Sequence, residues 1–107
     1  MKVPPMYLVQ ILLPLYNNHH KAFPRAHFDK VRTELTDNFG GVTAFLRSPA
    51  EGLWKEDDEQ VTRDDVLMFQ VTIESIDREW WSRYRRDLEN RFQQDEVLVV
   101  ATEIEKL

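Results

Sequence analysis

The chain contains no cysteine, and only three of its 107 residues are glycine. The absence of cysteine excludes disulfide bonds, thiolate metal sites and a cysteine nucleophile. The glycines form no phosphate-binding loop, no dinucleotide-binding G-x-G-x-x-G motif and no G-x-S-x-G nucleophile elbow. The sequence therefore lacks the short motifs that mark the common nucleotide-binding and hydrolase sites.

Long hydrophobic runs are also absent. The longest apolar stretch, 6–15, contains Gln10 and Pro14 and falls well short of the roughly 20 residues that cross a bilayer. One lysine, Lys2, precedes it and no small-residue cleavage site follows it, so the stretch does not resemble a signal peptide. We expect no membrane span and a cytoplasmic location.

Basic residues are fewer than acidic ones, 14 against 19, which gives a net charge of −5. This balance argues against a general nucleic-acid binder. Hydrophobic residues make up 42% of the chain and charged residues 31%, proportions that are typical of a globular protein. For a chain of this length, we expect residues 1–107 to form a single domain.

Two segments, 7–15 and 66–73, are apolar on both alternating faces apart from a few polar positions. Strands that are covered on both faces have this pattern, so we expect both segments in the middle of a sheet. Two further strands are expected at 42–47 and 96–104.

Two helices are expected between these strands. The first begins at Pro24 and ends at Gly40, which can adopt a left-handed conformation. The second is capped by Asp77. The predicted buried stripes are Phe28, Val31, Leu35 and Phe39 in the first helix, and Trp81, Tyr84, Leu88 and Phe92 in the second.

The element order β-α-β-β-α-β predicts an α+β, ferredoxin-like fold: a four-stranded antiparallel sheet with two helices on one face. That topology places the first and third strands in the centre, where their doubly apolar patterns fit.

The helices leave one face of such a sheet uncovered. On this outer face we expect Leu8, Gln10, Leu12, Val66, Met68 and Gln70, joined from the last strand by Leu98 and Val100 or by Val97 and Val99. Soluble monomers rarely expose so large an apolar patch, so we predict a homodimer formed through Leu8, Leu12, Val66 and Met68. Gln10 and Gln70 have two interpretations: a polar pair that fixes the dimer register, or the polar floor of a ligand cavity.

The three histidines, His19, His20 and His27, invite a metal interpretation. Two of them are neighbours in a loop, and no acidic residue joins them at a metal-ligand spacing, so we predict no metal site and no cofactor. His27 lies at the border of the first helix's apolar stripe, which suits a half-buried side chain. The question of a general base among the three stays open.

Arginines of the second helix have acidic partners four residues away, in the pairs Glu79–Arg83, Arg85–Glu89 and Asp87–Arg91. Ion pairs along the helix explain them without a nucleic acid. Arg91 lies near the apolar stripe, where it either covers the core edge or presents its guanidinium to an anionic ligand. Trp54 either packs a long hairpin against the sheet or lines a pocket beside Arg47.

Three stretches carry a resemblance: FGGVTAF at 39–45, GLW at 52–54 and FQQDEVLVV at 92–100. Together they resemble a family of small uncharacterised bacterial domains of unknown function, over most of the chain. This resemblance implies no catalytic residues. The expected fold also resembles the dimeric α+β barrel group, which includes small monooxygenases, isomerases and ligand-sensing modules, and this likeness implies a dimer rather than a particular reaction.

These observations predict a dimeric ligand-binding or interaction module. The alternative is a cofactor-free enzyme, a small monooxygenase or isomerase, that acts on an apolar small molecule between sheet and helices. An open cavity with a titratable or polar group inside it, such as His19, His27 or Arg91, would favour the enzyme.

Overall fold

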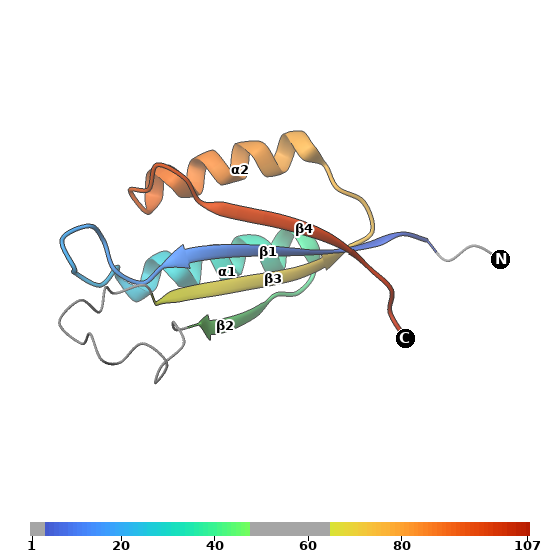
Figure 1. Ribbon diagram of the computed structural model, residues 1–107, viewed down its shortest axis with the longest axis horizontal. Coiled ribbons are helices and arrows are strands. Elements are labelled where there is room, and N and C mark those ends of the chain that lie inside the picture. The colour runs from blue at the N-terminus through green and yellow to red at the C-terminus, as the bar shows by residue number, and fades with distance from the viewer. Residues whose placement is uncertain (1–3, 48–64) are drawn as a thin grey trace, which may run out of the picture.

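The computed structural model describes residues 4–47 and 65–107 and contains one four-stranded sheet and two helices (Figure 1). In chain order the elements are β1 Met6–Pro14, α1 Arg25–Phe39, β2 Thr43–Arg47, β3 Val66–Ile73, α2 Arg78–Arg91 and β4 Leu98–Ile104. Every strand pair is antiparallel, and the strand order is β2-β3-β1-β4. The predicted α+β class and the predicted order of elements are therefore confirmed.

The two central strands are β1 and β3, as their sequences indicate. Their alternate residues Val9, Ile11 and Leu13 of β1, and Phe69, Val71 and Ile73 of β3, are buried on the face that carries both helices. The helices complete this core with Phe28, Val31 and Leu35 from α1 and Trp81, Tyr84 and Leu88 from α2. Each large apolar side chain buried in this way stabilises the fold by about 1.5–3 kcal/mol.

The residues at the helix ends determine where each helix begins and ends. Pro24 precedes α1 rather than opening it, one residue from the predicted start. Gly40 ends α1 in the left-handed region at φ 84°, and its N–H donates to the carbonyl of Thr36 at 2.7 Å. At the start of α2, Asp77 accepts a hydrogen bond from the backbone N–H of Trp80 at 3.1 Å, as predicted.

The last strand starts later than the sequence indicates, at Leu98 rather than at residue 96. Val97 is buried, and its backbone N–H donates at 3.1 Å to the carboxylate of Glu89 on α2 instead of to a strand. The burial of the Val97 side chain ahead of the strand explains why the apolar pattern begins before the strand itself. The other strand boundaries agree with the prediction within one residue.

Candidate functional site

The outer face of the sheet, on the side away from the helices, is the first candidate site. Strand pairing sets its residues in rows: Gln10 is the register partner of Gln70 on β3 and of Val100 on β4, and Gln70 is in turn the partner of Thr43 on β2. In this row Gln10 Nε2 donates to Gln70 Oε1 at 3.2 Å. The two glutamines, predicted only to share a face, are therefore direct neighbours.

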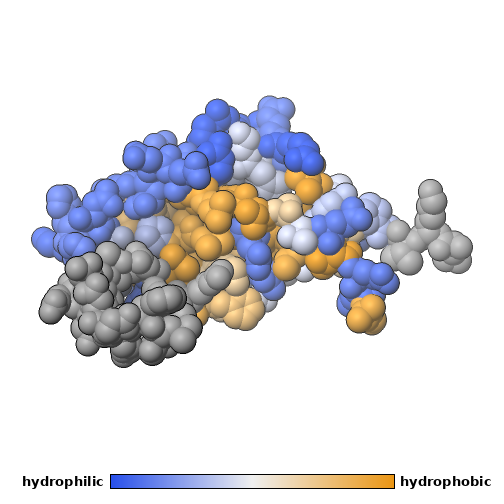
Figure 2. All heavy atoms as spheres, viewed as in Figure 1, coloured by the Kyte–Doolittle hydropathy of each residue, from blue (hydrophilic) through white to orange (hydrophobic). Residues whose placement is uncertain are grey.

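Next to the glutamines, one row of apolar side chains crosses all four strands. This apolar row consists of Phe45, Met68, Leu12 and Leu98, each the register partner of the next. Phe45 is 43% exposed and Leu98 is 50% exposed, both high for large apolar residues. Figure 2 shows apolar side chains gathered across the middle of this face.

The rest of the outer face is uncharged along most of its length. Strand register assigns to it Met6, Leu8, Pro14, Val66, Thr72, Val100, Thr102 and Ile104 in addition to the two central rows. Among the described strand residues, register places one charged residue on this face, Arg47, which lies at the end of β2 as the partner of Val66. Leu8, Leu12, Val66 and Met68 lie on the outer face, where the sequence placed them. From β4, Leu98 and Val100 lie on this face rather than Val97 and Val99.

Phe45 was missing from the predicted face. The alternation in β2 alone leaves its two faces ambiguous, because Ala44 and Leu46 are also apolar. Pairing of Phe45 with Met68 places Phe45 on the outer face. Arg47 closes β2 opposite Val66 in register, and Trp54 lies outside the described residues.

The histidines do not converge. His19 and His20 are exposed in the loop after β1, where the Asn17 side chain accepts from the backbone N–H of His19 at 2.8 Å. His27 is half-buried, with its ring 5.8 Å from the ring of Phe23 and 5.7 Å from that of Phe92. Across residues 4–47 and 65–107, no group of three or more histidine or acidic side chains could hold a metal ion.

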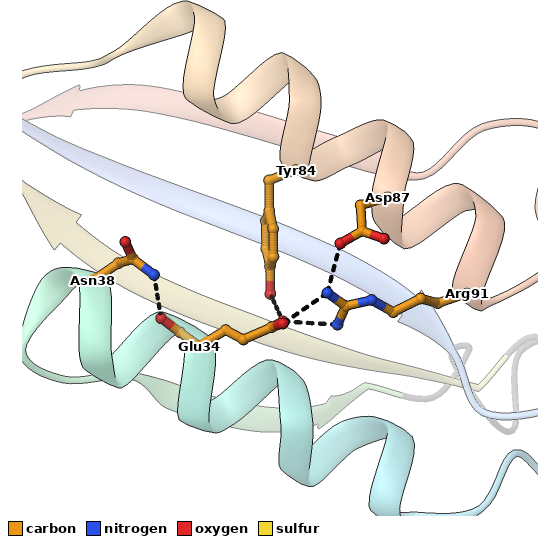
Figure 3. A network of polar contacts seen from close by, with 5 residues as sticks. All are labelled: Glu34, Asn38, Tyr84, Asp87 and Arg91. Atoms are coloured by element: carbon orange, nitrogen blue, oxygen red, sulfur yellow. Dashed lines mark hydrogen bonds and ion pairs between the residues drawn. The ribbon is translucent and has the colours of Figure 1, made fainter.

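Arg91 lies at the centre of a polar network between the two helices (Figure 3). Nη1 of Arg91 donates to Oε1 of Glu34 on α1 and Nη2 donates to Oε2, both at 2.7 Å. Nη2 also donates to Asp87 at 2.6 Å. The hydroxyl of Tyr84 donates to the same Glu34 carboxylate at 2.9 Å. Arg91 thus covers the core edge, and its donors to an anionic ligand are largely occupied by protein carboxylates.

The network shifts the pKa values of Glu34, Tyr84 and Arg91. Partial burial disfavours the charge on Glu34, but hydrogen bonds from Arg91 and Tyr84 outweigh this effect and hold the pKa of the carboxyl below its ordinary value. Burial, together with the bond to Glu34, raises the pKa of Tyr84 far above its ordinary range. The carboxylates likewise raise the pKa of Arg91. All three groups keep their present charges near neutral pH, as suits a structural clamp.

Sequence reasoning found the pairs within α2 but missed Glu34. The ion pairs Arg83–Glu79, Arg85–Glu89 and Arg91–Asp87 are all present. Glu34 precedes Leu35 and so borders the apolar stripe of α1, which is the only signal that the sequence offers. Nothing local shows which neighbour lies on that side of the helix.

A groove of about 470 Å³ lies between α2 and the β4 edge of the sheet, on the helix side. Its floor is formed by Val9 of β1 and Val99 of β4, and Trp81 forms part of its α2 wall. We call this feature the α2–β4 groove. None of the residues expected to supply chemistry, His19, His27 and Arg91, lines it.

Neither helix of the described part of the chain is long and apolar enough to cross a membrane. Comparison with family models, with curated proteins and with solved structures found no match to this chain.

Proposed function

We propose that the protein is a homodimeric interaction module, in which two copies pack their outer sheet faces against each other. The observation that carries the proposal is the apolar row Phe45–Met68–Leu12–Leu98, which crosses the whole uncovered face of the sheet. Soluble monomers rarely expose contiguous apolar patches beyond a few hundred Å². Covering this row removes the accessible parts of four large side chains from water, each at a gain of a fraction of the roughly 1.5–3 kcal/mol that full burial gives.

A second copy suits this face better than a partner of another kind. Among the described strand residues of the outer face only Arg47, at one end of β2, is charged, although 31% of the chain is charged, so most of the face has little to attract an acidic or basic partner. Two-fold symmetry sets the same patch against itself, and the uncharged apolar row meets no like-charge repulsion there. Gln10 and Gln70 already bond to each other, and their remaining amide donors and acceptors can pair across the two-fold axis.

The finer fold assignment belongs to the same proposal. A ferredoxin-like plait of the dimeric α+β barrel kind is supported by the element order β-α-β-β-α-β and by the central position of β1 and β3. The family of small uncharacterised bacterial domains suggested by residues 39–45, 52–54 and 92–100 also stays a proposal.

Light scattering coupled to size-exclusion chromatography tests the homodimer. We expect the wild-type chain at tens of micromolar to have twice its mass of 12.8 kDa. Met68→Glu places an unpaired charge in both copies and should give monomers. Leu98→Glu repeats the test at a side chain that is half exposed within one chain, where a charge does little harm to folding.

The matched control is Thr33→Glu, which adds the same charge on the exposed surface of α1 and should leave the dimer intact. A monomeric wild-type protein at these concentrations contradicts the proposal. So does a folded Leu98→Glu variant that keeps the dimer mass.

The alternative function, a cofactor-free enzyme acting between sheet and helices, has one observation in its favour: the α2–β4 groove. Catalysis needs a titratable group placed at the reacting atoms. The predicted candidates His19, His27 and Arg91 lie elsewhere, so none of the residues from which catalysis was expected lines the groove.

A further inference from the structure

The α2–β4 groove has walls of different chemistry. Along α2, positions 78, 81, 82 and 85 follow the spacing of one helix face and line the groove together. Along the sheet, Tyr7 and Val9 of β1 and Val99 and Ala101 of β4 line the same space, and Val9 and Ala101 are register partners. The base is thus apolar and aromatic, whereas the helix wall is polar, which is the usual composition of a small-molecule site.

The helix wall offers hydrogen-bond donors that the protein does not use. Arg78 has no hydrogen bond or ion pair with any described residue, and the same holds for the hydroxyl of Ser82. Arg85 uses one terminal nitrogen for Glu89 at 2.7 Å, which leaves its other N–H groups without a partner among the described residues. A guanidinium presents several N–H groups in one plane, a geometry that matches a carboxylate.

We propose that the α2–β4 groove binds a small organic acid: a flat apolar body lies against the accessible surfaces of Tyr7, Val99 and Ala101, and its carboxylate accepts from Arg78. A volume of about 470 Å³ is within the range of small-molecule sites. This site is on the helix side of the sheet, so it is independent of the proposed homodimer.

One acidic residue, Glu103, also lines the groove, beside Tyr7 in the register of β4 and β1. It forms no ion pair with Arg78 or Arg85. Its negative charge repels an incoming carboxylate, so Glu103 and Arg78 should affect the binding of an acid in opposite directions. Removal of the Glu103 charge should strengthen the binding of an acid, whereas removal of the Arg78 charge should weaken it.

Isothermal titration calorimetry with two probes of the same shape tests the proposal: 2-naphthoate, which is anionic, and 2-naphthamide, which is neutral. We expect one 2-naphthoate per chain, bound roughly threefold to tenfold more tightly than 2-naphthamide, as one solvent-accessible charged hydrogen bond would give. Arg78→Gln should abolish this preference, and Glu103→Gln should increase it. Arg86→Gln, which removes an exposed charge outside the groove on the same helix, should leave it unchanged.

Two further measurements locate the probe. Ala101→Phe fills the groove from an exposed position and should prevent binding of both probes. In amide NMR spectra, 2-naphthoate should shift Ser82 and Ala101 rather than Leu12 and Met68 on the outer face. The proposal is overturned if 2-naphthoate does not bind at millimolar concentration, if Arg78→Gln keeps the preference for the acid, or if the shifts concentrate on the outer face. A monomeric wild-type protein that still binds 2-naphthoate in the groove would refute the homodimer alone.

Discussion

Arg91 on α2 binds Glu34 on α1 through two parallel hydrogen bonds of 2.7 Å, and together with the hydrogen bond from Tyr84 to Glu34 these bonds link the two helices that cover the sheet. The Arg91 side chain is 17% exposed and that of Glu34 is 27% exposed, so both charges are largely withdrawn from water. Paired and hydrogen-bonded charges of this kind are tolerated, whereas one left alone is costly.

Arg91→Met should therefore destabilise the protein. It keeps most of the side-chain volume but leaves the Glu34 carboxylate with Tyr84 as its remaining side-chain donor. We expect a loss of about 1–3 kcal/mol in the free energy of unfolding, measured by urea denaturation. Arg83→Met, which breaks the exposed pair with Glu79, is the control and should cost less than about 0.5 kcal/mol. Equal effects of the two substitutions would contradict a special role for Arg91.

The same pair predicts an acid-dependent loss of stability. The pKa of Glu34 is lowered in the folded protein, so the unfolded chain binds the proton more readily. This contribution is fully present above the ordinary pKa of 4.5 and is lost as the pH falls through the lower, folded value. Urea midpoints measured from pH 6 downwards should show a shallower acid slope for Glu34→Gln than for wild type. Superimposable slopes would rule the contribution out.

Gly40 and Gly41 offer a test of backbone conformation with the control built into the chain. A Cβ at either position meets open space, but only Gly40 has a positive φ, of 84°. Gly40→Ala should cost about 1 kcal/mol, because a side chain disfavours the left-handed region. Gly41→Ala should be close to neutral or slightly stabilising. Thermal unfolding of both variants measures the difference, and equal melting temperatures would count against the cap.

The glutamine pair on the outer face predicts a non-additive effect on association. In the proposed dimer, Gln70→Leu leaves the Gln10 amide beside apolar groups without its partner, so it should weaken dimerisation by about 1–3 kcal/mol. The double variant Gln10→Leu, Gln70→Leu removes both amides and should recover much of that loss. Sedimentation equilibrium gives the dissociation constants. A double variant as weak as the sum of the two single variants would argue against a mutual pair.

Local sequence rules were sufficient to predict the order of the helices and strands and most of their bounds. The stripes Phe28–Val31–Leu35 and Trp81–Tyr84–Leu88 are buried as predicted, whereas Phe39, predicted to continue the first stripe, is only partly buried. The ends at Gly40 and Asp77 follow from the chemistry of neighbouring residues. The doubly apolar pattern of β1 and β3 also predicted these two strands at the centre of the sheet, where the structure has them.

Contacts between segments that are distant in the sequence could be identified only from the tertiary structure. The direct Gln10–Gln70 bond depends on strand register over 60 positions, and a slip of one residue would have turned every side chain to the other face. The Glu34–Arg91 fork depends on how two helices lie side by side, and the α2–β4 groove depends on how far α2 stands from the sheet edge. Periodicity fixes which face of an element is buried, but not which residue of another element it meets, because that choice is made by packing of the whole core.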